Sequence, residues 1–139
     1  MRPGGDERGE RAPVACKLLL VQATLVQWGL DAPVVREVIN PGSYHGPQPI
    51  DVAAVLGLGA RAEEGRVLIV ATPRGPIALR AAGHLHIVSV PQSEVLEVPS
   101  ELPRNPVSAA VRAVVLRDGE LPILLLSPER VAAAAGARR

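Results

Sequence analysis

Residues 111–126 read VRAVVLRDGELPILLL, and this stretch decides the fold class. Two apolar segments, 111–117 and 121–126, have the length and composition of short strands. Asp118-Gly119 falls between them, and both residues tolerate the positive φ that a tight type I′ turn requires. The stretch therefore predicts a β-hairpin closed by a type I′ turn.

A short helix is expected directly after this hairpin. Residues 127–129 read Ser-Pro-Glu, which is typical of a helix start. Ser127 is suited to cap the helix, proline is tolerated in the first turn, and an acidic residue there complements the helix dipole. The alanines at 132–135 continue the helix, and we expect it to end at Gly136.

Many more short strands are expected upstream of the hairpin. Pro or Gly interrupts the chain every eight to twelve residues, and the segments between are rich in leucine and β-branched residues. That spacing predicts an all-β sandwich or barrel. The expected strands comprise residues 17–23, 24–30, 66–72, 76–81 and 84–90, with a hairpin turn at 73–75.

Two short helical pieces are expected within this β-rich chain. Asp31 and Pro33 resemble a helix start, so residues 34–38 are expected to form one or two helical turns. Residues 53–58 are expected to form a helical turn that ends at a glycine. Residues 95–103 lie near prolines at both ends, and we expect them to leave the sheets as an excursion.

The composition argues against several functional classes. A net charge of +1, with one Trp, one Tyr and no Phe, argues against binding to nucleic acid. The longest apolar run has five residues, far too few to span a membrane. Cys16 is the only cysteine, which excludes an intrachain disulfide and fits a reducing, cytoplasmic location.

One folded domain is expected, over residues 14–136 of the 139. Residues 1–13 are rich in glycine, proline and charge, which predicts a disordered leader without the apolar region of a signal peptide. Residues 137–139 are expected to form a short tail.

No pattern in the chain predicts a catalytic site, a cofactor or a metal. His84 and His86 share one face of their expected strand, but no third ligand lies at a diagnostic spacing. A distant Cys16 or His45 stays open as a further ligand. We expect histidines that are exposed or hydrogen-bonded, and a protein that is not an enzyme.

Two other residues allow two interpretations each. Asp51 is isolated among apolar residues, so it either has a function or caps a helix or flanks a strand edge. Trp28 fits either a position in the core or, if it is exposed, an anchor at a protein interface.

Four segments in a fixed order carry a resemblance to a known family. Residues 34–38 (VVREV) are similar to a V-x-E-V/I motif, and residues 49–58 (PIDVAAVLGL) to P-V/I-x-D-L-x-x-L-L-G-L. Residues 66–79 are similar to the strand–turn–strand that follows, and residues 111–131 to the closing hairpin and helix. Together they resemble the CheW-like chemotaxis coupling proteins over about residues 15–135. The resemblance implies two small SH3-like β-barrels packed together.

One element of that family is missing. The family places a strand reading G-x-x-N-L-R-G between its first two motifs, whereas residues 39–48 alone separate them here. At about 3.3 Å per residue this connection crosses a barrel about once, and Pro41 and Gly46 within it favour turns. The chain therefore resembles a shortened, FrzB-like member. We expect an incomplete first barrel with a strand edge that is exposed or covered by the leader.

The resemblance implies a non-catalytic adaptor. In the family, the V-x-E-V segment lies near a groove between the barrels, where the helical tip of a methyl-accepting chemoreceptor docks. This implies that Val35, Glu37 and Val38 bind the receptor. The competing interpretation places both valines in the core and leaves Glu37 as a solvated charge.

The missing strand also affects the implied partners. In the family its Arg contributes to partner contacts, so we expect receptor binding with weak or absent binding to a CheA-type histidine kinase. An exposed strand edge would also favour self-association. From a different class, a small β-barrel that serves as a structural or nucleic-acid-binding module stays open as an alternative.

Overall fold

The computed structural model describes residues 15–23, 26–57, 65–98 and 109–137, and strands dominate these ranges. The strands form two curled sheets, and α3, with ten residues, is the longest helix among the described residues. The expected all-β fold with a short C-terminal helix is confirmed. The predicted leader at 1–13 and most of the predicted tail at 137–139 lie outside the described residues.

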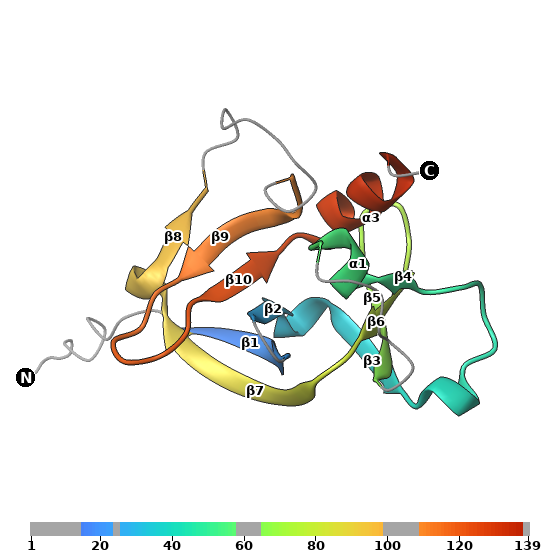
Figure 1. The fold of residues 1–139 in the computed structure, drawn as a ribbon, viewed down its shortest axis with the longest axis horizontal. Helices are drawn as coiled ribbons and strands as arrows, with labels where there is room; N and C mark the ends of the chain where they lie inside the picture. The colour runs from blue at the N-terminus through green and yellow to red at the C-terminus, as the bar shows by residue number, and fades with distance from the viewer. Residues whose placement is uncertain (1–14, 24–25, 58–64, 99–108, 138–139) are drawn as a thin grey trace, which may run out of the picture.

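The larger sheet has six strands in the order β7-β1-β2-β10-β9-β8 (Figure 1). Neighbouring strands pair antiparallel except β2 and β10, which run parallel. The strands are β1 (Ala15–Gln22), β2 (Gln27–Asp31), β7 (His84–Pro91), β8 (Val95–Glu97), β9 (Val111–Val115) and β10 (Ile123–Leu126). The 3-10 turn η4 (Gln92–Glu94) joins β7 to β8.

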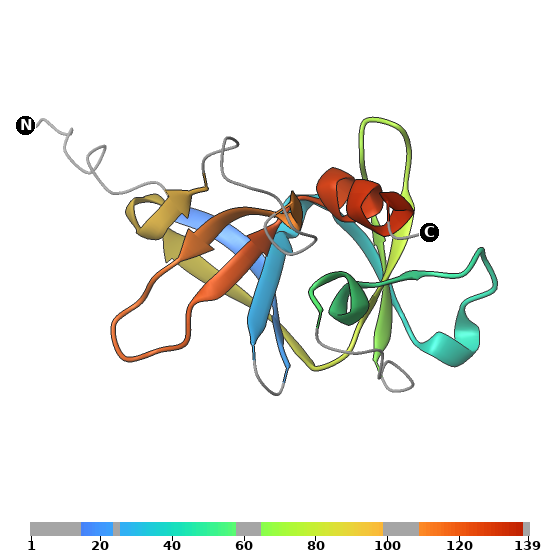
Figure 2. The ribbon, with the colours of Figure 1, turned by 45° about the horizontal axis from the view of Figure 1, so that its top comes forward.

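The smaller sheet has four strands in the order β3-β5-β6-β4. These are β3 (Val35–Ile39), β4 (Ile50–Asp51), β5 (Arg66–Val70) and β6 (Ile77–Ala81). Residues 40–49 between β3 and β4 hold the 3-10 turn η3 (Pro41–Ser43) and no strand. They swing away from the sheet before the chain returns as β4 (Figure 2). The expected shortening of this half of the fold is therefore seen directly.

The apolar run in β1 follows from burial on both of its faces. Leu18 and Leu20 pack in a core inside the six-stranded sheet, with side chains of β7, β9 and β10. Leu19 and Val21 point the other way, because side chains alternate along a strand. They join the main core, which combines residues of both sheets.

The main core also includes side chains of helices α1 and α3. Buried side chains of α1 (Val52–Val55) and α3 (Pro128–Ala137) pack there against residues of both sheets. Trp28 of β2 belongs to this core and is 2% exposed, so its core interpretation is confirmed and the exposed anchor is wrong.

The prediction of helix for residues 34–38 is wrong. The 3-10 turn η2 (Ala32–Val34) forms, but residues from Val35 onward are strand β3. Valine has a low helix propensity and a high strand propensity, and pairing with β5 fixes the extended conformation. Asp31 does not cap the turn; its carboxylate accepts two hydrogen bonds from Arg112 at 2.8 and 3.0 Å.

Two other details of the expectation need correction. Residues 95–97 are strand β8 and not an excursion, because they pair with β9. Residues 99–103 of the predicted excursion lie outside the described residues. The Asp118-Gly119 hairpin forms, but no described non-glycine residue has a positive φ. A type I′ turn needs a positive φ at both of its central residues, but of the two only Gly119 has one, at 74°, so the turn is not type I′. The backbone N–H of Glu120 donates to the Arg117 carbonyl at 3.2 Å.

The helices predicted near residues 53 and 128 are present. Ser127 Oγ accepts from the Arg130 N–H at 3.3 Å, which confirms the predicted N-cap. The helix continues to Ala137, one residue past the predicted end at Gly136. The expected helical turn near residue 53 is α1, and Gly57, with a φ of 77°, follows it.

Candidate functional site

The candidate site lies on β3, which is a margin of the four-stranded sheet. β3 pairs with β5 along one edge, and no described strand pairs with its other edge. Val35 is partly buried, whereas Glu37 and Val38 are exposed. The three residues named from the sequence thus lie on one strand with an open edge.

The register places these residues on two different faces of the sheet. Val35 lies opposite Val70, and Val38 lies opposite Leu68, so both valines share the face of buried main-core residues. Glu37 lies opposite Ile69 and projects from the other face. The register shifts between Val35 and Glu37, which is why residues three apart share a face.

Val38 is exposed although it lies on the core face. Its exposed fraction is 45%, whereas its cross-strand neighbour Leu68 is fully buried. The difference arises because β3 is the margin of the sheet, so no strand among the described residues lies on the outer side of Val38. Val35 is closer to the core and packs against it. The interpretation of both valines as core residues therefore holds in part for Val35 but not for Val38.

A further exposed apolar residue lies on β7. Ile87 is 57% exposed and lies opposite Leu19, a main-core residue, so it also flanks the main core. β3 and β7 belong to different sheets, and each is a margin of its own sheet. We use the name β3–β7 margin for Val35 and Val38 of β3 together with Ile87 of β7.

Sequence reasoning did not select Ile87 as a site residue, although a signal was present. In the strand HLHIVSV, alternation puts Leu85 and Ile87 on the same face. Leu85 packs against the main core, while Ile87 remains exposed further along the strand. The sequence does not reveal that this strand lies at the margin of its sheet, which is why Ile87 remains exposed.

Charge is available beside this margin. Arg36 and Glu37 are both exposed, and Glu37 forms no ion pair with any described residue. A partner's cation therefore does not have to displace an existing ion pair of Glu37.

The histidines on β7 do not form part of a recognisable metal site. His84 and His86 are both exposed and lie opposite Gln22 and Leu20. Over the ranges that the structure describes, no three His, Cys, Asp or Glu side chains come close enough to hold a metal ion. Cys16 is partly buried near the start of β1.

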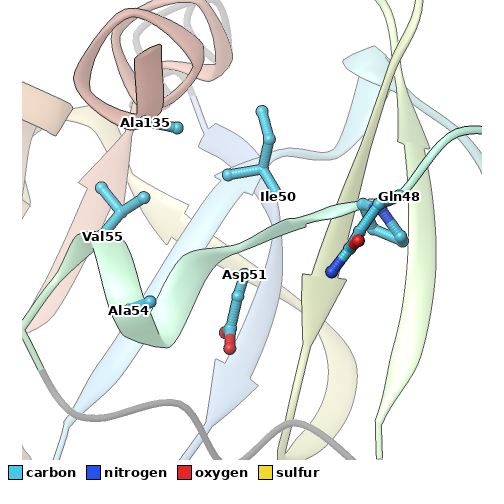
Figure 3. Close-up of a pocket in the computed structure, with 7 residues that line it drawn as sticks. Gln48, Ile50, Asp51, Ala54, Val55 and Ala135 are labelled. Atoms are coloured by element: carbon cyan, nitrogen blue, oxygen red, sulfur yellow. The ribbon is translucent and has the colours of Figure 1, made fainter. Parts of the chain in front are cut away.

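Asp51 has the capping role that the sequence left as one of two interpretations. Its Oδ1 accepts from the Ala53 N–H at 3.1 Å at the start of α1. It also lines a pocket of about 270 Å³ between β4, α1 and α3. Figure 3 shows Ile50 directed toward Ala135 of α3, whereas Asp51 points the opposite way, near Ala54.

None of the helices in the described residues is both long and apolar enough to cross a membrane.

The likeness to known proteins lies in the fold. No family model matches the chain, and no curated protein sequence matches it. Among solved structures, the scaffolding protein TtCheW from Thermoanaerobacter tengcongensis matches with a TM-score of 0.65 and 18% sequence identity. The match covers 82% of this chain and 90% of that protein. The CheW-like, all-β fold expected from four short segments is therefore confirmed.

Proposed function

We propose that the chain is a non-catalytic, cytoplasmic adaptor of a chemotaxis-like signalling array, which binds the helical tip of a methyl-accepting chemoreceptor. The observation that carries this proposal is the exposed apolar β3–β7 margin in a CheW-like fold. Val38 and Ile87 are large apolar side chains that remain 45% and 57% exposed beside the main core. Exposed apolar residues that flank a core are typical of docking surfaces.

The physical logic is that of a helix laid on an apolar surface. Val38 and Ile87 would lose their remaining contact with water. Glu37 projects from the other face of β3, so it would fix the register of a bound helix that lies across the open edge of the strand. Burial of an aliphatic side chain stabilises by about 1.5–3 kcal/mol, so covering the exposed half of Val38 contributes about 1 kcal/mol. Several such contacts are sufficient for a reversible signalling interaction.

We propose further that direct kinase binding is weak or absent. The four-stranded sheet has no strand between β3 and β4 in sequence, so the partner surface that a complete SH3-like barrel would present is altered. In this respect the chain would be a specialised, FrzB-like form. The open edge of β3 would also favour self-association, since unpaired backbone groups invite another strand.

The binding test compares variants of the β3–β7 margin with a matched control. The probe is the cytoplasmic helical tip of a methyl-accepting chemoreceptor from the same genome, titrated by calorimetry. Glu37→Lys should weaken binding by about tenfold, and Val38→Ala by about two- to fivefold, in keeping with the contribution of about 1 kcal/mol from Val38. Leu116→Ala is the control, because Leu116 is 50% exposed but follows β9 in the other sheet.

Thermal unfolding of each variant separates binding from folding. The expected result is weaker binding for the two β3 variants with little loss of stability, and wild-type binding for Leu116→Ala. If Glu37→Lys left both receptor affinity and stability unchanged, the assignment of this margin to the receptor would be wrong.

A further inference from the structure

Two histidines and one amide side chain come together where β7 begins. His84 and His86 are two residues apart on β7, so their side chains share one face of the sheet. Both are exposed, so water and ions can reach their rings. Gln22, the exposed last residue of β1, lies directly opposite His84 and therefore shares that face.

The backbone holds this corner of the sheet in place. β1 and β7 pair along the whole of β1, up to and including the pair of Gln22 and His84. Directly opposed residues have Cβ atoms about 4.5–5.5 Å apart, and residues two apart on a strand are separated by about 6.6 Å. Three long polar side chains at these spacings can surround one small ion.

A series of amide hydrogen bonds determines which atom of Gln22 is available. Gln27 of β2 is buried, and its Nε2 donates to the carbonyl of Leu121 at 3.0 Å. A carbonyl can only accept, so the Gln27 amide presents its oxygen to Gln22, whose Nε2 donates to it at 2.8 Å. The Nε2 of Gln22 is thereby used, and its Oε1 remains as the atom that a cation would meet.

These three residues offer two imidazole nitrogens and one amide oxygen. Imidazole suits Zn²⁺, Cu²⁺ and Ni²⁺, and a mixed set of nitrogen and oxygen ligands favours Cu²⁺ or Ni²⁺. Mg²⁺ and Ca²⁺ instead prefer oxygen ligands. Within the described ranges no third His, Cys, Asp or Glu joins the two histidines, and Cys16 lies opposite Val90, far along β7. The third ligand is therefore an amide, which spacing in the sequence could not reveal.

We propose that His84, His86 and Gln22 form a surface site for a divalent transition-metal ion, which binds Cu²⁺ most tightly. The two imidazoles supply most of the affinity, the Oε1 of Gln22 supplies a third ligand, and water fills the remaining positions. Side chains alternate along a strand, so this site lies on the opposite face of β7 from Ile87. The inference does not depend on receptor binding.

The test titrates the full chain, purified without a histidine tag, with CuCl₂, ZnCl₂ and MgCl₂ in separate calorimetric experiments. We expect saturable binding of Cu²⁺, weaker binding of Zn²⁺ and no saturable binding of Mg²⁺. The electron paramagnetic resonance spectrum of the Cu²⁺ complex should show coordination by nitrogen. This signature should be lost when both histidines are replaced by alanine.

Single variants locate the ion on the protein. His84→Ala and His86→Ala should each weaken Cu²⁺ binding by at least about tenfold, because loss of a ligand costs no less than loss of an outer-shell partner. His45→Ala is the matched control, since His45 is also exposed but lies between β3 and β4, and it should bind normally. Gln22→Leu should weaken binding by a smaller factor. Gln22→Glu should strengthen it, because it places a charged oxygen beside the ion.

Three outcomes would overturn the inference. The first is no saturable binding of Cu²⁺ to the unmodified chain. The second is unchanged affinity in both His84→Ala and His86→Ala, or an equal loss in His45→Ala, since either result would place the ion elsewhere. The third is unchanged affinity in both Gln22 variants, which would remove the third ligand. All of these substitutions change exposed side chains, and thermal unfolding of each variant checks that the fold is retained.

Discussion

Gly83 joins the two sheets, and its replacement tests how closely they are connected. It lies between β6 and β7 with a φ of 142°, a conformation that residues with a Cβ rarely adopt. A Cβ at this position would lie 2.4 Å from the carbonyl oxygen of Gln22 and 2.9 Å from its carbonyl carbon. Both atoms belong to the backbone of β1, so neither can rotate away.

The expected cost of Gly83→Ala combines two terms. Strain in this region of φ costs about 1–3 kcal/mol, and forcing an extra carbon into a packed site costs about 1–3 kcal/mol more. The free energy of unfolding should therefore fall by about 2–6 kcal/mol. Gly119→Ala provides the control, because Gly119 also has a positive φ but no atom within 4 Å of its Cβ position. Strain alone should cost it about 1–2 kcal/mol.

The assay is equilibrium unfolding in urea for the wild type and both alanine variants. Linear extrapolation gives each free energy of unfolding, and equal slopes show that the variants expose the same surface when they unfold. Gly83→Ala should be the less stable variant by at least about 1 kcal/mol, which is the lower bound of the overpacking term. If it lost no more stability than Gly119→Ala, the close approach of Gly83 to Gln22 would be wrong, and with it the placement of the junction between the sheets.

Three further predictions concern the core and the C-terminal helix. Leu20→Ala should lower the free energy of unfolding by about 2–5 kcal/mol, because Leu20 is 1% exposed. Leu121→Ala should lower it by under about 0.5 kcal/mol, because Leu121 is 56% exposed. Urea unfolding measures both values, and similar losses of stability would contradict the burial of Leu20. Ser127→Ala should destabilise the protein by about 1 kcal/mol through loss of the N-cap, whereas Ser127→Asp, which can still cap, should be nearly as stable as the wild type. Equal melting temperatures for the wild type and Ser127→Ala would argue against the cap. The fluorescence of Trp28, which is 2% exposed, should resist quenching by iodide in the native protein; efficient quenching there would place the indole at the surface.

Local chemistry accounts for what the sequence predicted correctly. The position of the Asp118-Gly119 turn (though not its type), the Ser127 cap and the Asp51 cap, which was one of two interpretations, each depend on residues within a few positions of one another. The alternation and length of apolar segments identified most of the strands. These features lie within single elements, so one sequence is sufficient to recognise them.

Features that depend on distant pairing were not recognisable in the same way. Val35 begins a strand because β5 pairs with it, and β5 starts at Arg66, 31 residues later. The exposure of Val38 and Ile87 follows from which strands end the two sheets, and a residue's own neighbours in sequence do not reveal that. The family resemblance indicated Glu37 and Val38 as site residues. The register shift in β3 is what places Val35 and Val38 on one face of the sheet and Glu37 on the other.

The central claim is that this CheW-like chain binds a chemoreceptor tip and does not bind the kinase on its own. The most direct measurement is a pair of titrations of the purified chain, one with the receptor's helical tip and one with a CheA-type histidine kinase without receptor. The account predicts saturable binding to the tip and no detectable binding to the kinase. Direct capture of the kinase in the absence of receptor, or no binding to the tip, would contradict it.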